Sequence, residues 1–261
     1  MSGALFSAAT GMNAQQHKLD TISNNLANVD TTGFKKTRDE FADLMYKYMK
    51  RTGAPGNTES GKSQVYTGLG VQVANNTKLF TQGSLQETGR ELDVAIKGPG
   101  FFGVQQPDGD VLYTRAGDLH YDASTGTLLT SMGYPIMNGA VPLDVPQSTI
   151  KDITIQPNGM VLVNDNQVGQ IGMYNCVNPE NLRSMGDNLY DDTALSGQME
   201  VFEPTGGPTG TVLLQGYLEK SNVNAVQEMV DMISAQRAYE FNSKAITTAD
   251  NMMQTINALK R

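Results

Sequence analysis

The segment LFSAATGMNAQQHKLDTISNNLANV, residues 5–29, has the clearest periodicity in the chain. Apolar residues recur every seven positions at Leu5, Met12, Leu19 and Leu26. Ala8, Ile22 and Val29 fill most of the intervening d-like positions of the heptads. A repeat of this length predicts a helix that supercoils against a partner helix. Gly33 follows Thr31 and Thr32, and its freedom to adopt the left-handed conformation suits it to close the helix. We therefore predict a helix over residues 1–30.

The outer face of this predicted helix carries little charge. Lys18 and Asp20 are the only charged side chains between residues 1 and 29. A charged side chain on a face covered by other helices would lose its hydration without compensation, so a small uncharged face indicates burial in an assembly. The alternative is an ordinary amphipathic helix that packs on a globular core.

The last forty residues, 222–261, carry a second apolar stripe with a helical period. Its members are Val223, Val226, Val230, Ile233, Phe241, Ala245, Ala249, Met252, Ile256 and Leu259. Arg237 alone interrupts the stripe, and Asn224 with Gln227 forms a candidate capping box. We predict a second long helix here. Because the apolar seams of both ends lack partners in a single chain, we expect both ends to be partly disordered in a dilute monomer.

Between the two ends, short β-branched and aromatic runs alternate with turn residues. The runs are Leu92–Lys97, Phe101–Gln105, Val111–Arg115, Ile153–Gln156, Met160–Val163, Gln170–Tyr174 and Val212–Leu218. The tripeptides Pro107-Asp108-Gly109 and Pro157-Asn158-Gly159 have the residue order of tight hairpins. We predict an antiparallel β-rich domain over residues 71–221, and hence an α+β fold.

Residues 31–70 connect the first helix to this domain and are locally basic. Between residues 31 and 51 the basic residues are Lys35, Lys36, Arg38, Lys47, Lys50 and Arg51, against Asp39, Glu40 and Asp43. The connector is therefore expected either to contact acidic neighbours or to be a solvated linker. Residues 38–50 read as helix, followed by a loop rich in glycine, serine and proline.

Composition excludes several classes of function. The formal charge of −8 disfavours nucleic acids and anionic membranes as partners. One cysteine, Cys176, and two histidines, His17 and His120, allow neither an internal disulfide nor a Cys/His zinc site. We expect no metal, no cofactor and no membrane insertion, and no cleaved signal peptide is visible.

Two glycine-rich motifs resemble nucleotide-binding loops. GNTESGKS, residues 56–63, matches the phosphate-loop pattern, but helix-like sequence precedes it and extended sequence follows, the reverse of what that loop requires. GPGFFG, residues 98–103, follows a strand but leads into another strand, so its two phenylalanines are expected to enter a core. A nucleotide-binding protein acting through residues 56–63 is thus a distant hypothesis for the function. A β-rich adhesive module is another.

Longer segments resemble a known family. SNNLANVDTTGFKK, residues 23–36, and SNVNAVQEMVDMISAQRAYEFNSKAI, residues 221–246, are similar to the terminal signatures of bacterial flagellar rod and hook proteins. DVAIKGPGFFGV and LYTRAG between them are also similar. The resemblance covers essentially the whole chain and is closest to subunits of the distal rod, with proximal rod or hook-type subunits as the alternative.

The resemblance implies a structural polymer and no enzymatic activity. The terminal helices of many subunits would pack in concentric coiled-coil layers, with the β domain outside them. The rigid helical tube would transmit torque from the motor to the hook. Implied partners are further copies of the chain, the proximal rod proteins, the hook protein, the surrounding ring proteins and the flagellar export apparatus. The implied location is the basal-body rod in the cell envelope.

The resemblance also implies which residues pack subunits together. The N-terminal signature contributes Asn24, Asn25, Leu26, Asn28, Gly33 and Phe34. The C-terminal signature contributes Asn222, Asn224, Gln236, Arg237, Ala238, Tyr239 and Asn242. The apolar seams add Leu5, Met12, Leu19, Ile22, Val230 and Ile233. Buried amides and Arg237 are expected to fix the register between neighbouring subunits.

Overall fold

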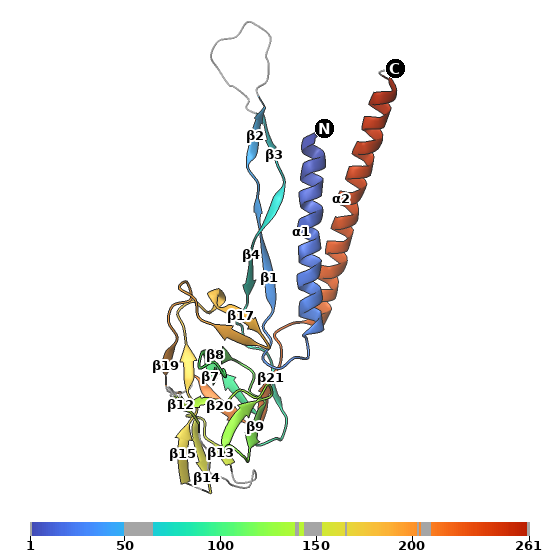
Figure 1. Cartoon of the computed structure of the whole chain (residues 1–261). Helices are drawn as coiled ribbons and strands as arrows, with labels where there is room; N and C mark the ends of the chain where they lie inside the picture. Colours follow the sequence, from blue (N-terminus) through green and yellow to red (C-terminus); the bar gives the residue numbers. More distant parts are fainter. Residues whose placement is uncertain are drawn as a thin grey trace. The chain divides into compact units, whose positions relative to one another are not determined.

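The computed structural model describes residues 2–49, 65–138, 141–143, 153–164, 166–202, 204 and 210–259 (Figure 1). A long helix lies at each end of the chain and the region between them is rich in strands, so the predicted α+β class is confirmed. The chain divides into two compact units. Unit 1 comprises residues 1–26, 37–77 and 225–261, and unit 2 comprises residues 27–36 and 78–224.

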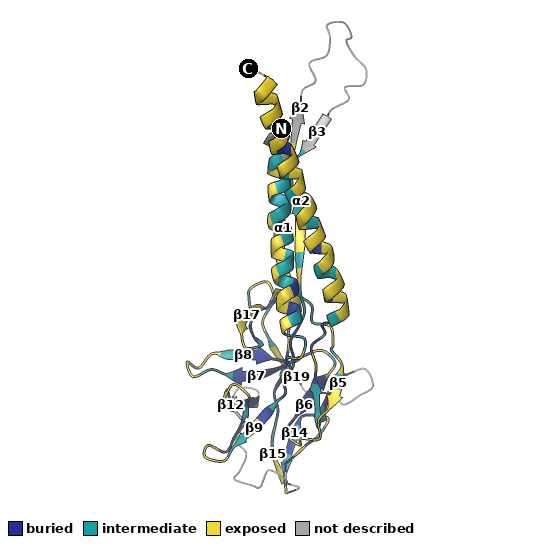
Figure 2. Cartoon of the chain, turned by 90° about the vertical axis from the view of Figure 1, so that its right-hand side faces the viewer, coloured by how far each residue is buried: buried dark blue, intermediate teal, exposed yellow. Residues whose placement is uncertain are grey.

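Unit 1 contains the two helices, α1 (Ser2–Ala27) and α2 (Ala225–Leu259), which lie side by side in both views (Figures 1 and 2). Near one end, Asn25 Nδ2 donates a hydrogen bond to Glu228 Oε2 at 3.3 Å. Farther along the pair, about midway along α2, a Cβ added to Gly11 would lie 2.9 Å from Asn242 Nδ2. From the first contact to the second, the residue number falls along α1, from Asn25 to Gly11, and rises along α2, from Glu228 to Asn242. The two helices therefore run antiparallel.

The rest of unit 1 is a two-stranded ribbon. Strand β1 (Thr37–Asp43) pairs with β4 (Val71–Lys78), and β2 (Tyr46–Met49) pairs antiparallel with β3 (Val65–Gly68). The prediction of helix over residues 38–50 was therefore wrong. The partner strands lie beyond residue 64, and strand formation depends on cross-strand pairing that no local window contains.

The ribbon follows α1 along its length. Thr21 Oγ1 donates to Asp39 Oδ1 at 2.9 Å, and farther along the helix the Val71 amide donates to Thr10 Oγ1 at 3.4 Å. The eleven residue steps along the helix from Thr21 to Thr10 span about 16 Å, the length of about five residues of strand. Gly70 permits the close approach, because a Cβ there would lie 2.0 Å from Thr10 Oγ1.

Unit 2 is built from small sheets. The largest has six strands in the order β17 (Arg183–Gly186), β18 (Leu189–Asp191), β8 (Val111–Thr114), β7 (Phe101–Gln105), β16 (Met173–Asn175) and β19 (Glu200–Phe202). A three-stranded sheet joins β13 (Ile153–Ile155), β14 (Met160–Val163) and β15 (Asn166–Gln170). These ladders are antiparallel, as predicted.

Four strand pairs complete unit 2. They are β9 (Leu119–Asp122) with β10 (Thr127–Thr130), β11 (Met137–Asn138) with β12 (Val141–Pro142), β6 (Val94–Lys97) with β20 (Val212–Gln215), and β5 (Leu85–Glu87) with β21 (Tyr217–Glu219). A short 3-10 helix spans Pro179–Asn181. The predicted runs 170–174 and 212–218 are each split into two strands, the second at Gly216, whose φ is 78°.

Two apolar clusters support these sheets. The larger is mainly aliphatic and contains Phe102, Val104, Leu119 and Leu128 among its fully buried members. The smaller is largely aromatic and contains Phe101, Tyr113, Tyr174 and Tyr190. Phe101 and Phe102 thus enter different clusters from opposite faces of β7, which confirms that the GPGFFG glycines precede a core strand. None of the described helices is long and apolar enough to cross a bilayer.

Candidate assembly surface and buried charge cluster

The apolar stripe predicted on the C-terminal helix is largely exposed in the single chain. Its exposed members are Val226, Val230, Ile233, Phe241, Met252, Ile256 and Leu259, which we call the α2 stripe. Phe241 is 68% exposed and Leu259 82%. Burial of one large apolar side chain contributes about 1.5–3 kcal/mol. Covering the α2 stripe with another surface would therefore stabilise the association considerably.

A neighbouring side of α2, which includes the predicted stripe member Ala249, packs within unit 1. Glu228, Ala235 and Ala249 are buried, whereas Gln236, Arg237 and Tyr239 are exposed together with Val230 and Ile233. On α1, the seam residues Leu5, Met12, Leu19 and Leu26 are half-buried and Ile22 is buried. The predicted packing residues therefore divide into a set that the chain covers itself and a set that it leaves exposed.

Asn25 fixes the reversal from α1 into the ribbon. The Thr37 amide donates to Asn25 Oδ1 and Asn25 Nδ2 donates to the Thr37 carbonyl, both at 2.9 Å. The same side chain reaches Glu228 on α2 and is 1% exposed. Asn24 is exposed, and Asn28 is half-buried and accepts from Thr31 Oγ1 at 3.2 Å.

Gly33 and Phe34 are buried inside unit 2. Gly33 has a φ of 69°, as predicted, but α1 already ends at Ala27, so closing the helix is not its role. The Gly33 amide donates to the Glu219 carbonyl at 2.9 Å, and an added Cβ would lie 2.7 Å from the Ala116 nitrogen. Lys78 Nζ lies 5.1 Å from the centre of the Phe34 ring.

Asn222 connects three segments of unit 2, while Asn224, two residues later, is exposed. The Asn222 Oδ1 accepts from the Lys36 amide at 2.7 Å. Its Nδ2 donates to the Leu79 carbonyl at 2.8 Å and the Thr81 carbonyl at 3.1 Å. This asparagine therefore stabilises the subunit itself, and Asn242 likewise lies against Gly11 within the chain.

Unit 2 contains a buried charge cluster that no local sequence pattern indicated. Lys35 Nζ lies 2.6 Å from Glu219 Oε1, and Arg115 Nε lies 3.0 Å from Glu219 Oε2. The three side chains are 0 to 3% exposed. Lys35 is thus not part of a solvated linker, and its acidic neighbour is in its own chain. Burial, reinforced by the nearby Arg115 cation, lowers the pKa of Lys35 to about 8.

Arg115 also explains the second glycine-rich motif. Its two terminal nitrogens donate to the Gly98 carbonyl at 2.9 Å and the Gly100 carbonyl at 3.1 Å. Both glycines have positive φ, 115° and 128°. The motif therefore presents carbonyl oxygens to a guanidinium group, which is the opposite of the amide donors that a phosphate would need.

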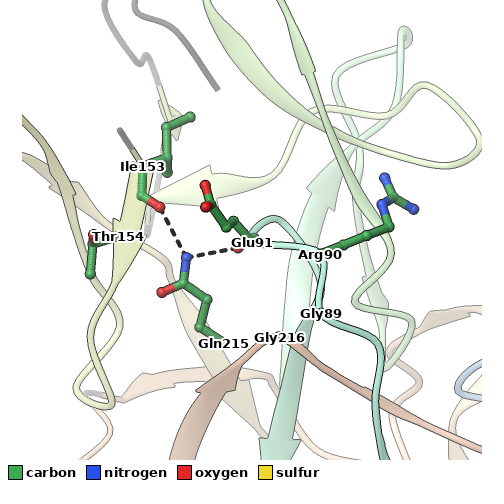
Figure 3. Close-up of a pocket in the computed structure, with 7 residues that line it drawn as sticks. All are labelled: Gly89, Arg90, Glu91, Ile153, Thr154, Gln215 and Gly216. Atoms are coloured by element: carbon green, nitrogen blue, oxygen red, sulfur yellow. Dashed lines mark hydrogen bonds between the residues drawn. The ribbon is translucent and has the colours of Figure 1, made fainter. Parts of the chain in front are cut away.

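A shallow pocket at the edge of unit 2 is lined by Gly89, Arg90, Glu91, Ile153, Thr154, Gln215 and Gly216 (Figure 3). Gln215 Nε2 donates to the Glu91 carbonyl at 2.7 Å and the Ile153 carbonyl at 3.0 Å. The Arg90 side chain points away from Gln215 (Figure 3). The polar groups here hold strands together rather than converging on a ligand.

Other candidate chemical groups are dispersed. His17 and His120 are exposed on different elements. Among the described residues, no three histidine, cysteine or acidic side chains are grouped to hold a metal ion. The GNTESGKS segment, residues 56–63, lies outside the described residues.

Three family models match successive parts of the chain. Residues 5–35 match the flagella basal body rod protein model, residues 95–163 the flagellar hook protein FlgE/F/G D1 domain, and residues 214–259 the flagellar basal body rod FlgEFG protein C-terminal model. The flagellar basal-body rod protein FlgG of Borreliella burgdorferi is 44% identical over the full length of both chains. The chain belongs to the flagellar basal-body rod protein family.

Other rod proteins are similar over nearly the same length. FlgG of Buchnera aphidicola from Schizaphis graminum is 42% identical over 99% of this chain and its own full length. FlgG of Agrobacterium fabrum is 43% identical over 97% of this chain and 98% of its own. Lys35, Arg115 and Glu219 fall one each within the three segments that match rod-protein models.

Proposed function

We propose that the protein is the structural subunit of the distal rod of the bacterial flagellum. It assembles into a rigid helical tube that transmits torque from the motor to the hook. The relatives named FlgG support this assignment, because each is similar over the length of the rod subunit. The alternative is a proximal rod or hook-type subunit of the same family.

The observation that carries the proposal is the exposed α2 stripe. Its apolar side chains run along a helix of 35 residues, and α1 lies against a different side of that helix. A surface that complements a different surface on the next copy gives an open helical polymer rather than a closed dimer. Further copies of this chain are thus the proposed occupants of the stripe.

In this assembly, α1 and α2 form a coiled-coil-like helical domain, which comprises residues 1–30 and 222–261. Residues 31–70, which contain the ribbon strands β1, β2 and β3, are the proposed connector to the β-rich domain of residues 71–221, whose first residues form the remaining ribbon strand β4. Val230, Ile233, Gln236, Arg237 and Tyr239 are proposed to face neighbouring subunits, since all five are exposed in the single chain. Arg237 is proposed to set the register. Arg237→Ala that assembles normally and supports full motility would contradict that role.

The proposed partners follow from position in the rod. They are the proximal rod proteins, the hook protein and the surrounding ring proteins, and the flagellar export apparatus is proposed to deliver the subunit. The rod crosses the cell envelope, and the subunit has no catalytic role.

The test is to locate a label in purified basal bodies. Cys176 is buried and burial raises the pKa of its thiol, so it is a poor labelling site. Val177, 84% exposed, is the better position in a Cys176→Ser/Val177→Cys chain. Biotin–gold label in a helical array along the distal shaft supports the proposal. Label confined to the proximal rod or hook selects the alternative, and a flagellum without label rejects both.

A further inference from the structure

The chain passes between its two units four times, after Leu26, Lys36, Thr77 and Asn224. The parts of unit 2 that adjoin these crossings are residues 27–36, 78–84 and 217–224. We call them the first, second and third junction segments. All three belong to unit 2, and the contacts among them described below lie within that unit.

Backbone hydrogen bonds join every pair of junction segments. The Gly33 amide of the first segment donates to the Glu219 carbonyl of the third. The Leu79 amide of the second donates to the Lys36 carbonyl of the first, and the Lys220 amide of the third donates to the Ser84 carbonyl of the second. Each bond is 2.9 Å long. The three segments thus close a triangle of contacts.

Glu219 reinforces this triangle from the third segment. Its Oε1 accepts from Lys35 Nζ of the first segment at 2.6 Å and from the Gly83 amide of the second at 2.8 Å. Its Oε2 accepts from Arg115 at 3.0 Å, and Arg115 is bound in turn to the loop between β6 and β7. One buried carboxylate therefore binds the other two junction segments and the sheet domain together.

Asn222 repeats the arrangement without charge. As described above, it binds the Lys36 amide of the first segment and the Leu79 and Thr81 carbonyls of the second. Lys35 Nζ also donates to the Thr81 carbonyl, at 2.8 Å. Glu219 and Asn222 of the third segment thus each bind both the first and the second segment. A change in any one segment therefore removes hydrogen bonds from the other two.

We infer that the three junction segments form one cooperative block in which Glu219 and Asn222 are the positioning residues. The block opens and closes as a unit, so no single crossing can loosen alone. It directs strain arriving at any crossing into the sheets of unit 2. The role in carrying strain rests on the proposed rod function, whereas the cooperativity of the block does not.

The test is residue-resolved amide hydrogen exchange on the purified monomer of Lys35→Met. The reporters are the amides of Leu79 and Lys220, whose hydrogen bonds involve neither the Lys35 side chain nor the Glu219 carboxylate. Breaking the buried pair should accelerate exchange at both reporters on the order of 100-fold. The matched control is Lys97→Met, which removes an exposed lysine of unit 2 and should leave both reporters unchanged.

Faster exchange confined to residues 33–36, with Leu79 and Lys220 at wild-type rates, would overturn the inference. If Lys35→Met instead accelerates the core amide of Val104 equally, Asn222→Ala decides, because it leaves every charge in place. Acceleration at both Gly33 and Lys220 then supports one block, and acceleration at Lys36 alone refutes it. Because the monomer is measured, these outcomes are independent of where the Val177→Cys label appears in the flagellum.

Discussion

At the scale of single residues, Arg115 makes a set of hydrogen bonds that a lysine could not make. Its guanidinium group donates to Glu219 and to the carbonyls of Gly98 and Gly100 from a site that is 3% exposed. A lysine cannot present donors in this planar fork. We expect Arg115→Lys to lower the free energy of unfolding by about 2–3 kcal/mol, because it leaves buried acceptors unpaired. Denaturant unfolding measures this directly.

The control for that substitution is Arg183→Lys. Arg183 also pairs with a carboxylate, that of Asp191, but its side chain is 63% exposed. Exposed pairs contribute about 0–1 kcal/mol, so this variant should unfold close to the wild-type midpoint. Equal destabilisation by the two changes would mean that the fork geometry of Arg115 is irrelevant.

Lys35 gives a second residue-scale prediction, on pH. Its pKa falls from an ordinary 10.5 to about 8 in the folded chain, chiefly through burial and then through Arg115. Between these values the unfolded chain binds more protons than the folded one, so this group makes the protein more stable as pH rises. Relative to Lys35→Met, the wild type should gain on the order of 3 kcal/mol between pH 7 and pH 10.5.

The difference between the two proteins is the quantity to measure, by urea unfolding at several pH values. It cancels the titration of buried tyrosines such as Tyr113, whose pKa burial raises to about 12. The free energy of unfolding of the wild type minus that of Lys35→Met should increase as pH rises. If this difference stays constant or decreases, the lowered pKa of Lys35 is contradicted.

At the scale of elements, the helices were predictable and the ribbon was not. Helical hydrogen bonds and side-chain spacing are local, so the repeat from Leu5 to Leu26 was enough to predict this helix. β1 depends on β4, whose residues begin at Val71, and a reading of residues 38–50 alone could not include them. The same holds for the buried charges, since Glu219 follows Lys35 by 184 residues and Arg115 by 104.

The sequence also left open what covers the α2 stripe, because a helical period marks an apolar face without naming its partner. The stripe yields an element-scale prediction. Val230→Ser with Ile233→Ser removes two exposed apolar side chains, so the monomer should unfold within about 0.5 kcal/mol of wild type. Polymerisation should be lost, because those side chains are proposed to be buried only between subunits.

Sedimentation and electron microscopy of the purified protein separate these effects. Thr248→Ser with Asn251→Ser changes exposed polar positions on the same helix and should leave assembly intact. Normal filaments from the Val230→Ser/Ile233→Ser chain would show that the α2 stripe is not the assembly surface.

At the scale of the whole molecule, the charge is divided unevenly. Unit 2 contains nine basic and eighteen acidic residues, a net charge of −9, whereas unit 1 contains ten basic and nine acidic residues, a net charge of +1. In the proposed assembly, apolar contacts through the helices would bring together copies of this strongly acidic unit. We predict that salt promotes polymerisation, because it screens repulsion between neighbouring β domains, with a Debye length that falls from about 30 Å at 0.01 M to about 8 Å at 0.15 M.

The critical concentration for assembly should therefore decrease as sodium chloride rises over this range, and light scattering measures it. Substituting exposed acids of unit 2, as in Asp108→Asn with Asp110→Asn, should flatten the dependence. The same change of charge in unit 1, Glu240→Gln with Asp250→Asn, should flatten it less, because unit 1 is nearly neutral. A critical concentration that rises with salt would mean that attraction between opposite charges, rather than the apolar α2 stripe, drives the assembly.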